Sequence, residues 1–203
     1  MTLLETLRNI KSDYVRMAQM QGIRLFPIRF LFIGITPSIV ALTLYRFSHY
    51  FYVKRLRILA WLLWLFNRYL TGVDITPSTE IGASCYIGHT VGTVISGKLG
   101  NNVMMFNGPC IGGGMGRGDV GAGEGLPVIG DNVVIGARAL IGGPIRIGNN
   151  VSIGAGALVL KDVKDDGCMV CRPAVAVKSP GIDYEEIAGI DRKERLSLRP
   201  ERS

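Results

Sequence analysis

A six-residue period dominates the second half of the chain and limits what it can fold into. Aliphatic residues recur every six positions from Ile75, and glycine usually follows each of them. An α-helix repeats every 3.6 residues and a strand every two, so neither explains this spacing. A parallel β-helix does, because each hexad forms one short side and three hexads close one coil. The repeat positions are Ile75, Ile81, Ile87, Thr93, Leu99, Met105, Ile111, Ile129, Ile135, Ile141, Ile147, Ile153 and Val159.

The residues between the repeat positions support the same coil. Small or β-branched residues, such as Cys85, Val91 and Val103, follow four places after the aliphatic residues, and we expect them to share the interior. Cys110 is also expected to face inward. Glycine and asparagine, including the pairs at 101–102 and 149–150, supply turn conformations that branched residues resist. The repeat therefore predicts a mainly β fold with about four coils.

One interruption breaks the repeat between Ile111 and Ile129. Residues 112–127 are rich in glycine and lack an inward aliphatic pattern. We expect the chain to leave the coil here as a protruding loop, either as part of a binding site or as a flexible decoration. The segment lacks the G-x-x-x-x-G-K-[ST] pattern of a nucleotide-binding P-loop.

Composition and charge exclude several classes of protein. Twenty-seven glycines argue against a helical bundle, and 48% hydrophobic residues argue against a disordered linker. Residues 1–70 carry ten Lys/Arg against two Asp/Glu, whereas 71–203 carry thirteen against fourteen. The basic character therefore lies in the N-terminal third, but no zinc-finger or RNP pattern indicates nucleic-acid binding.

The cysteines and the N-terminus point to a cytoplasmic protein. Cys168 and Cys171 form a lone C-x-x-C without a second pair or a nearby histidine, so we predict reduced thiols and no metal site. The first residues are charged and lack the apolar core of a signal peptide.

Several stretches of the chain resemble the serine acetyltransferase branch of the hexapeptide-repeat acyltransferases. They are YRFSHYFY (45–52), GVDITPSTEIG (72–82), YIGHTVGTVISG (86–97), IGGGMG (111–116), PVIGDNVVIGARA (127–139), VSIGAGALVLKDV (151–163) and RPA (172–174). The resemblance implies a left-handed coil, a homotrimer and acetyl-CoA as the donor. It also implies that Asp74 and His89, fifteen positions apart, form a catalytic dyad. His49, in the first of these stretches, is expected to be structural.

The proposed dyad suits acetyl transfer to a hydroxyl group. The attacking oxygen must lose its proton, and a neutral imidazole at position 89 has a suitable basicity for accepting it near pH 7. A carboxylate at position 74 would fix the imidazole tautomer and stabilise the imidazolium. Backbone N–H groups near Gly113 could stabilise the tetrahedral intermediate.

The resemblance also implies a donor site in a groove between subunits. By position, the small residues Gly113, Gly114, Ala137 and Ala155 match those along the pantetheine arm. The family's basic residue after the RPA element is replaced by Val175, so Arg172 or Lys178 would have to meet the nucleotide phosphate.

Departures from the family pattern raise a question about the acceptor. Gly88 stands where the family usually has an aspartate that holds the serine ammonium group, and Gly125, Leu126 and Pro127 replace an Arg-His-Pro. We therefore predict a sugar, polysaccharide or lipid-linked acceptor, bound through Asp119 and Glu124 of the loop. The alternatives are serine itself or a non-catalytic scaffold. The chain ends in ERS, without the isoleucine that many members dock on cysteine synthase, so no such docking is expected.

The N-terminal region combines apolar and basic segments. Residues 30–45 and 58–66 are uncharged but shorter than the ~20 residues that span a bilayer, and arginine and lysine flank both. We expect residues 27–70 either to contact a membrane surface at the inner face or to form a buried helical cap. The predicted organisation is a helical region at 1–70, a β-helix at 71–178 and a tail at 179–203.

Overall fold

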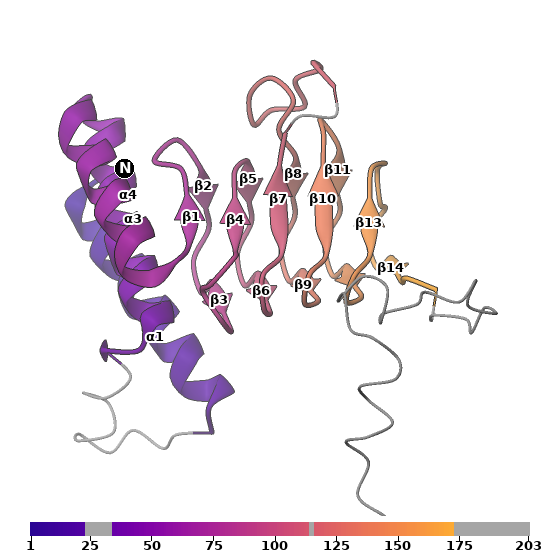
Figure 1. The fold of residues 1–203 in the computed structure, drawn as a ribbon, viewed down its shortest axis with the longest axis horizontal. Helices are drawn as coiled ribbons and strands as arrows, with labels where there is room; N and C mark the ends of the chain where they lie inside the picture. The colour runs from indigo at the N-terminus through magenta and orange to yellow at the C-terminus, as the bar shows by residue number, and fades with distance from the viewer. Residues whose placement is uncertain (23–33, 114–115, 173–203) are drawn as a thin grey trace, which may run out of the picture. The chain divides into compact units, whose positions relative to one another are not determined.

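The computed structural model describes residues 1–22, 34–113 and 116–172. Residues Met1–Cys171 form one compact unit, and Arg172–Ser203 belong to a second. The first unit begins with helices α1 (Leu3–Met20), α3 (Pro37–Val53) and α4 (Arg57–Thr71) and continues as a stack of short strands (Figure 1). The predicted order of helices followed by coils is thus observed within this unit.

Within the described residues, fourteen strands of two or three residues form three parallel sheets. Sheet A contains β1 (Asp74–Ile75), β4 (Val94–Ile95), β7 (Cys110–Gly112), β10 (Leu140–Gly142) and β13 (Leu158–Val159), in that order. Sheet B contains β2 (Glu80–Ile81), β5 (Lys98–Leu99), β8 (Val128–Ile129) and β11 (Arg146–Ile147). Sheet C contains β3 (Tyr86–Ile87), β6 (Met104–Met105), β9 (Val134–Ile135), β12 (Ser152–Ile153) and β14 (Cys168–Met169). The chain visits the sheets in turn, which makes each coil a three-sided unit.

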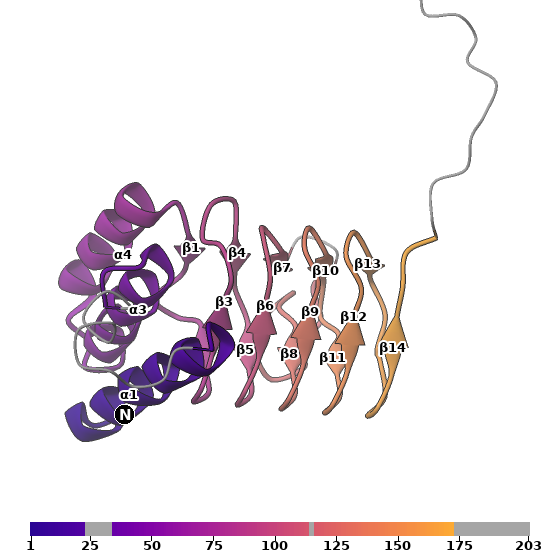
Figure 2. The same cartoon turned by 90° about the horizontal axis from the view of Figure 1, so that it is seen from below.

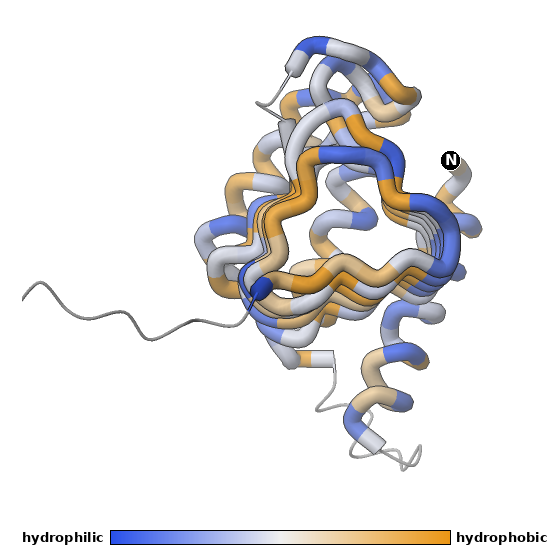
Figure 3. Tube along the Cα trace, turned by 90° about the vertical axis from the view of Figure 1, so that its right-hand side faces the viewer, coloured by the Kyte–Doolittle hydropathy of each residue, from blue (hydrophilic) through white to orange (hydrophobic). Residues whose placement is uncertain are grey.

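The core of the coils is a set of stacked aliphatic side chains, one from each strand. Along sheet A, for example, Ile95, Ile111 and Ile141 pair in register, and each is 0% exposed. Seen along the axis of the coils, successive coils superpose on one closed outline (Figure 3). These features confirm the predicted left-handed parallel β-helix.

Asparagine ladders stabilise one corner of the coils. Asn102, Asn132 and Asn150 have φ angles of 55° to 57°, in the left-handed region. The Asn102 amide donates to Asn132 Oδ1 at 2.8 Å, and the Asn132 amide donates to Asn150 Oδ1 at 3.0 Å. Asparagine tolerates this backbone conformation, and its side-chain amide makes a hydrogen bond to the asparagine of the next coil. These two properties explain why asparagine occupies the turns.

Two predictions about the inward positions are wrong, and a third is correct only in part. Thr93 is 0% exposed, as an inward residue should be, but Ile95 takes the predicted place in the stack and pairs with Ile75 and Ile111 in sheet A. Val91 is 75% exposed, because the turn after β3 is wider than a hexad allows. Cys110 is exposed because it occupies the outward position of β7, next to the buried Ile111. Cys85 is buried as predicted, and burial raises the pKa of its thiol.

The helices pack at the first coils, and α1 runs beside β3 (Figure 2). α1 begins with a capping box between Thr2 and Glu5, and α3 has Pro37 in its first turn.

None of the helices in the described ranges combines the length and apolar character needed to cross a membrane.

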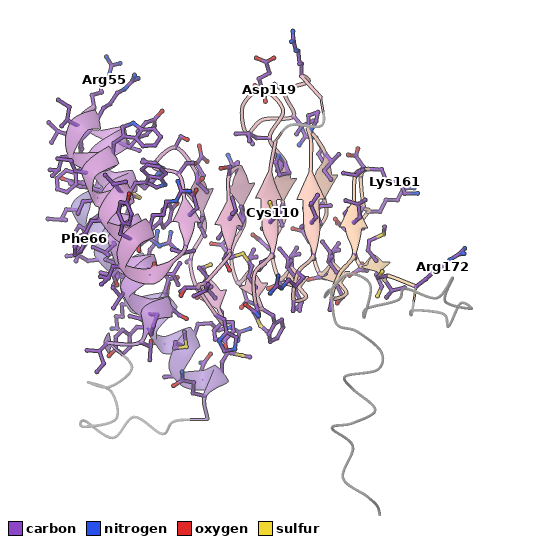
Figure 4. The ribbon with its side chains drawn as sticks, in the orientation of Figure 1. Arg55, Phe66, Cys110, Asp119, Lys161 and Arg172 are labelled. Atoms are coloured by element: carbon purple, nitrogen blue, oxygen red, sulfur yellow. The ribbon has the colours of Figure 1, made fainter. Side chains whose placement is uncertain are left out.

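One face of α4 is apolar and exposed, and it points away from the coils, as Figure 4 shows for Phe66. Its exposed apolar residues are Ile58, Leu59, Trp61, Leu62, Leu65, Phe66, Tyr69 and Leu70.

Candidate active site

His89 lies in a widened turn between β3 and β4. The inward residues Ile87 and Ile95 are eight positions apart instead of six, and the next inward residue, Leu99, follows after only four. Hydrogen bonds hold the turn, with Thr93 Oγ1 donating to His89 O at 3.0 Å. The His89 side chain is exposed, and within the described residues its imidazole has no hydrogen-bond partner.

A helix end anchors the same turn. The Gly92 N–H donates to Gly72 O at 3.3 Å, and Gly72 ends α4 in the left-handed conformation with φ 74°. A Cβ added at Gly72 would lie 3.4 Å from Val91 Cα, so the turn and the helix end approach closely. The position of His89 therefore depends on where α4 stops.

Asp74 is the first residue of β1 and contacts the His89 turn through its backbone. Its N–H donates to Thr93 O at 2.9 Å. Its carboxylate accepts a hydrogen bond from Trp64 Nε1 at 2.8 Å and lies 3.5 Å from Arg68 Nη1. The structure thus brings Asp74 next to the His89 turn, but the carboxylate contacts α4 and makes no hydrogen bond to His89 among the described residues.

Ala137 and Ala155 lie at the edge of the β-helix that also carries His89. Each follows a strand of sheet C and precedes a strand of sheet A, as His89 does. The Gly156 N–H donates to Ala137 O at 2.8 Å, so the two alanines stack on successive coils. Ala137 is half-buried and Ala155 is exposed. Small side chains along this edge leave the backbone open to a ligand.

The loop after β7 leaves from the opposite edge of sheet A, between sheets A and B (Figure 1). Its tip carries Asp119, which projects away from the coils (Figure 4). Asp119 Oδ1 accepts hydrogen bonds from the N–H groups of Gly121 at 2.7 Å and Gly123 at 3.1 Å. These bonds hold the pKa of the Asp119 carboxyl below its usual value. Glu124 is exposed on the same loop.

The remaining predicted site residues are less well placed. Gly113 is exposed at the base of the loop, where an added Cβ would lie 3.2 Å from Gly125 O. Arg172 is exposed and belongs to the second unit. Gly114 and Lys178 lie outside the described residues. Across the described ranges, no three His, Cys, Asp or Glu side chains gather as a metal site requires.

Sequence reasoning missed two residues of this site. Trp64 and Arg68 contact Asp74 from α4, in a region for which the sequence predicted only a membrane contact or a helical cap. The available signal was a tryptophan and an arginine four positions apart, shortly before the VD of the first hexad. Residues four apart lie on one face of a helix.

Comparisons with known proteins agree with the fold. The family model described as bacterial transferase hexapeptide (six repeats) matches residues 127–161. The serine acetyltransferase of Mycobacterium tuberculosis is 38% identical over 155 residues, which cover 73% of this chain and 66% of that protein. The serine acetyltransferase of Helicobacter pylori is 36% identical over 129 residues, covering 63% of this chain and 73% of that protein.

A solved structure extends the likeness to the helices. The crystal structure of the Neisseria gonorrhoeae serine acetyltransferase in complex with serine matches with a TM-score of 0.73 and 31% identity. The match covers 85% of this chain and 69% of that one. For three of the most similar curated relatives, the chain spans 66%, 61% and 64% of their length.

Proposed function

Because this chain belongs to the serine acetyltransferase family of hexapeptide-repeat transferases, we propose that it transfers an acetyl group from acetyl-CoA to the hydroxyl group of L-serine. The observation that carries the proposal is that His89 and Asp74 lie at one edge of the first coils. His89 is in a turn held by hydrogen bonds, and Asp74, in β1, is bonded to that turn through its backbone N–H. The same edge continues past the small residues Ala137 and Ala155. These positions support a base, an acidic residue and a donor site along one edge.

The proposed reaction needs one proton acceptor. The exposed His89 imidazole takes the proton of the acceptor hydroxyl as its oxygen attacks the thioester carbonyl. The Asp74 carboxylate orients the imidazole and stabilises the imidazolium. The tetrahedral intermediate then breaks the C–S bond, the imidazolium returns the proton to the CoA sulfur, and the acetyl ester is released. Backbone N–H groups near Gly113 would stabilise the intermediate.

We propose that the donor lies along the edge that carries the two alanines. A pantetheine arm needs close approach to the backbone, and the methyl groups of Ala137 and Ala155 leave that approach open. The basic residues Arg172 and Lys178 remain predicted contacts of the nucleotide phosphate.

A homotrimer with shared sites would explain why the predicted residues fall on two edges. In one chain, His89 and the loop that carries Asp119 lie at opposite ends of the sheet A strands. A neighbouring subunit could bring its loop to the His89 edge. The outward face of sheet A is suited to such a contact, because an apolar stripe of paired residues runs along it. The stripe consists of Val94, Cys110, Leu140 and Leu158.

The choice of serine as acceptor rests on the relatives. The Neisseria protein was solved with serine bound, and the curated relatives carry the same name. A sugar hydroxyl is the second candidate, and it is favoured by Gly88 and Gly125, which stand where the family pattern has an aspartate and an arginine. Asp119 and Glu124 are exposed on the loop and could bind either acceptor.

Measuring CoA release tests the function directly. The purified protein is incubated with acetyl-CoA and either L-serine or a panel of sugars and sugar nucleotides, and a thiol reagent follows free CoA. Rapid release with L-serine supports the proposal, and release with sugars alone supports the second candidate. If no acceptor gives release above the hydrolysis background, a non-catalytic scaffold becomes the better description.

We also propose that α4 contacts the inner surface of a membrane from the cytoplasm. Ile58 and Tyr69 on its apolar face are 81% and 83% exposed, and basic residues border the helix at Lys54, Arg55 and Arg57. Apolar area beside positive charge suits an anionic lipid surface. Sedimentation with phosphatidylglycerol vesicles tests this contact. Binding that disappears in Ile58→Ser and with phosphatidylcholine vesicles supports it, and no binding to either vesicle rejects it.

A further inference from the structure

Three side chains meet where α4 joins the first coil. Trp64 Nε1 donates to Asp74 Oδ1 at 2.8 Å, and Arg68 Nη1 lies 3.5 Å from Asp74 Oδ2. The Arg68 guanidinium also lies over the Trp64 ring, 5.6 Å from its centroid. Both oxygens of the proposed catalytic carboxylate therefore face groups of α4.

The sequence fixes this arrangement through helical spacing and a tight turn. Trp64 and Arg68 are four positions apart, so both side chains lie on one face of α4. Gly72 ends the helix in the left-handed conformation, and Val73 is fully buried immediately afterwards. The chain thus enters β1 close enough to α4 for Asp74 to contact Trp64 and Arg68.

The hydrogen bond from Trp64 should hold the Asp74 carboxylate more firmly than the ion pair with Arg68 does. The Arg68 side chain is 55% exposed, and ion pairs between exposed groups contribute little because water screens them. The Trp64 N–H is a neutral donor on a half-buried ring, at an ordinary hydrogen-bond distance from a carboxylate that is only 23% exposed. Removing Trp64 would leave Asp74 free to change rotamer.

We infer that Trp64 is a positioning residue for Asp74. Its indole N–H holds the Asp74 carboxylate in one orientation, beside the turn that carries His89. This inference rests on the proposed function. A carboxylate offers about four acceptor directions, so bonds to Trp64 and Arg68 leave others for an imidazole. Trp64 acts through Asp74 and does not contact the reacting atoms.

Kinetics of matched variants test this role. Trp64→Phe keeps an aromatic ring but removes the donor, and we expect kcat to fall about tenfold, the usual worth of one hydrogen bond to a charged group, with KM for acetyl-CoA unchanged. Trp61→Phe is the control, because Trp61 lies on the same helix and contacts the Trp64 ring edge-on but makes no bond to Asp74. Equal kcat values for the two variants would overturn the inference, and so would a rise in kcat for Trp64→Phe.

A double-mutant cycle separates positioning from general damage to the fold. In an Asp74→Ala background the carboxylate is gone, so adding Trp64→Phe should change kcat by less than about twofold. A full further loss in the double variant would mean that Trp64 acts by another route and would reject the role.

A spectroscopic test works without any activity. The chain has two tryptophans, so a ¹⁵N-labelled sample gives two indole N–H signals, which the two Trp→Phe variants assign. The Trp64 signal should shift when Asp74→Ala removes its acceptor, while the Trp61 signal stays. An unmoved Trp64 signal rejects the inference even if the enzyme is active. If the Trp64 signal shifts but the protein releases no CoA, the contact between Trp64 and Asp74 is supported and the proposed function is rejected.

Discussion

Asp13 and Arg46 form a buried ion pair that joins α1 to α3. Arg46 Nε lies 3.0 Å from Asp13 Oδ2, Arg46 Nη2 lies 3.1 Å from Asp13 Oδ1, and both side chains are 2% exposed. The pair also reaches the first coil. Arg46 donates to the carbonyls of Ile81 and Gly82, and Asp13 Oδ1 accepts from the Cys85 N–H at 2.8 Å. Two helices and the first coil therefore depend on one charged pair.

Breaking this pair should destabilise the protein strongly. Asp13→Ala leaves the Arg46 guanidinium buried without its counter-ion, and we expect the free energy of unfolding to fall by about 3–5 kcal/mol. The control is Glu80→Ala, which breaks the surface ion pair between Glu80 and Lys98. Both side chains of this pair are about half exposed, so the free energy of unfolding should fall by less than about 1 kcal/mol. Urea denaturation followed by circular dichroism, at one protein concentration, measures both. Similar losses in the two variants would contradict the prediction.

His49 should make stability depend on pH. Its Nδ1 lies 2.9 Å from Pro77 O and therefore carries the proton in the neutral ring. Burial lowers the pKa of His49 below its usual value, against the opposing effect of the Pro77 bond. A lowered folded pKa means that the unfolded chain binds the proton first, so stability is complete above about pH 6.5 and is lost as the pH falls through the folded pKa.

Thermal melts between pH 7.5 and 5.5 check this dependence. The wild-type Tm should fall over the range, and His49→Gln should flatten the slope. His89→Ala, which removes the exposed histidine, serves as the control and should keep the wild-type slope. An unchanged slope in His49→Gln would assign the dependence to other groups.

Most of the coil could be predicted from the sequence, because a fixed period places one aliphatic residue on each side of every coil. The prediction failed at the His89 turn. There the chain takes two extra residues before Ile95 and two fewer before Leu99, so the later register is unchanged. The six-residue period alone could not reveal this compensated shift. It therefore assigned to Thr93 the place in the stack that Ile95 occupies. The widened turn is also what exposes His89.

The helices were much less predictable. Their apolar segments indicated burial or a membrane contact, but periodicity does not state which residue of a helix meets which coil. The contacts of Trp64 with Asp74 and of Arg46 with Asp13 join residues 10 and 33 positions apart, through polar groups that no hydrophobic pattern predicts. Packing decides such contacts, and only the structure locates them.

Gly88 offers a test of acceptor specificity. Its backbone does not require glycine, and an added Cβ would lie 3.5 Å from Met105 O, an ordinary contact. Gly88→Asp introduces the carboxylate that the family pattern has before the histidine. We expect KM for L-serine to fall about tenfold, as one charge-assisted hydrogen bond to the ammonium group predicts.

The matched control is Gly88→Asn, which has nearly the same shape without the charge. CoA release with L-serine and with the best sugar acceptor is measured for both variants. Only the aspartate should improve serine use, and neither variant should improve the sugar reaction. Equal behaviour of the two variants would reject the electrostatic explanation.

His89→Ala should remove activity and leave the fold intact. The side chain is exposed, and its imidazole makes no hydrogen bond to the described residues, so its loss should change stability by less than about 0.5 kcal/mol. If the imidazole accepts the hydroxyl proton, kcat should fall about 10²–10⁴-fold. Val91→Ala is the control, because Val91 is 75% exposed on the same turn and should keep near-wild-type turnover. Tm and kcat are measured on the same samples. A folded His89→Ala protein with full activity would end the catalytic assignment. A fall in kcat in both variants would indicate that the shape of the turn, and not the imidazole, limits the reaction.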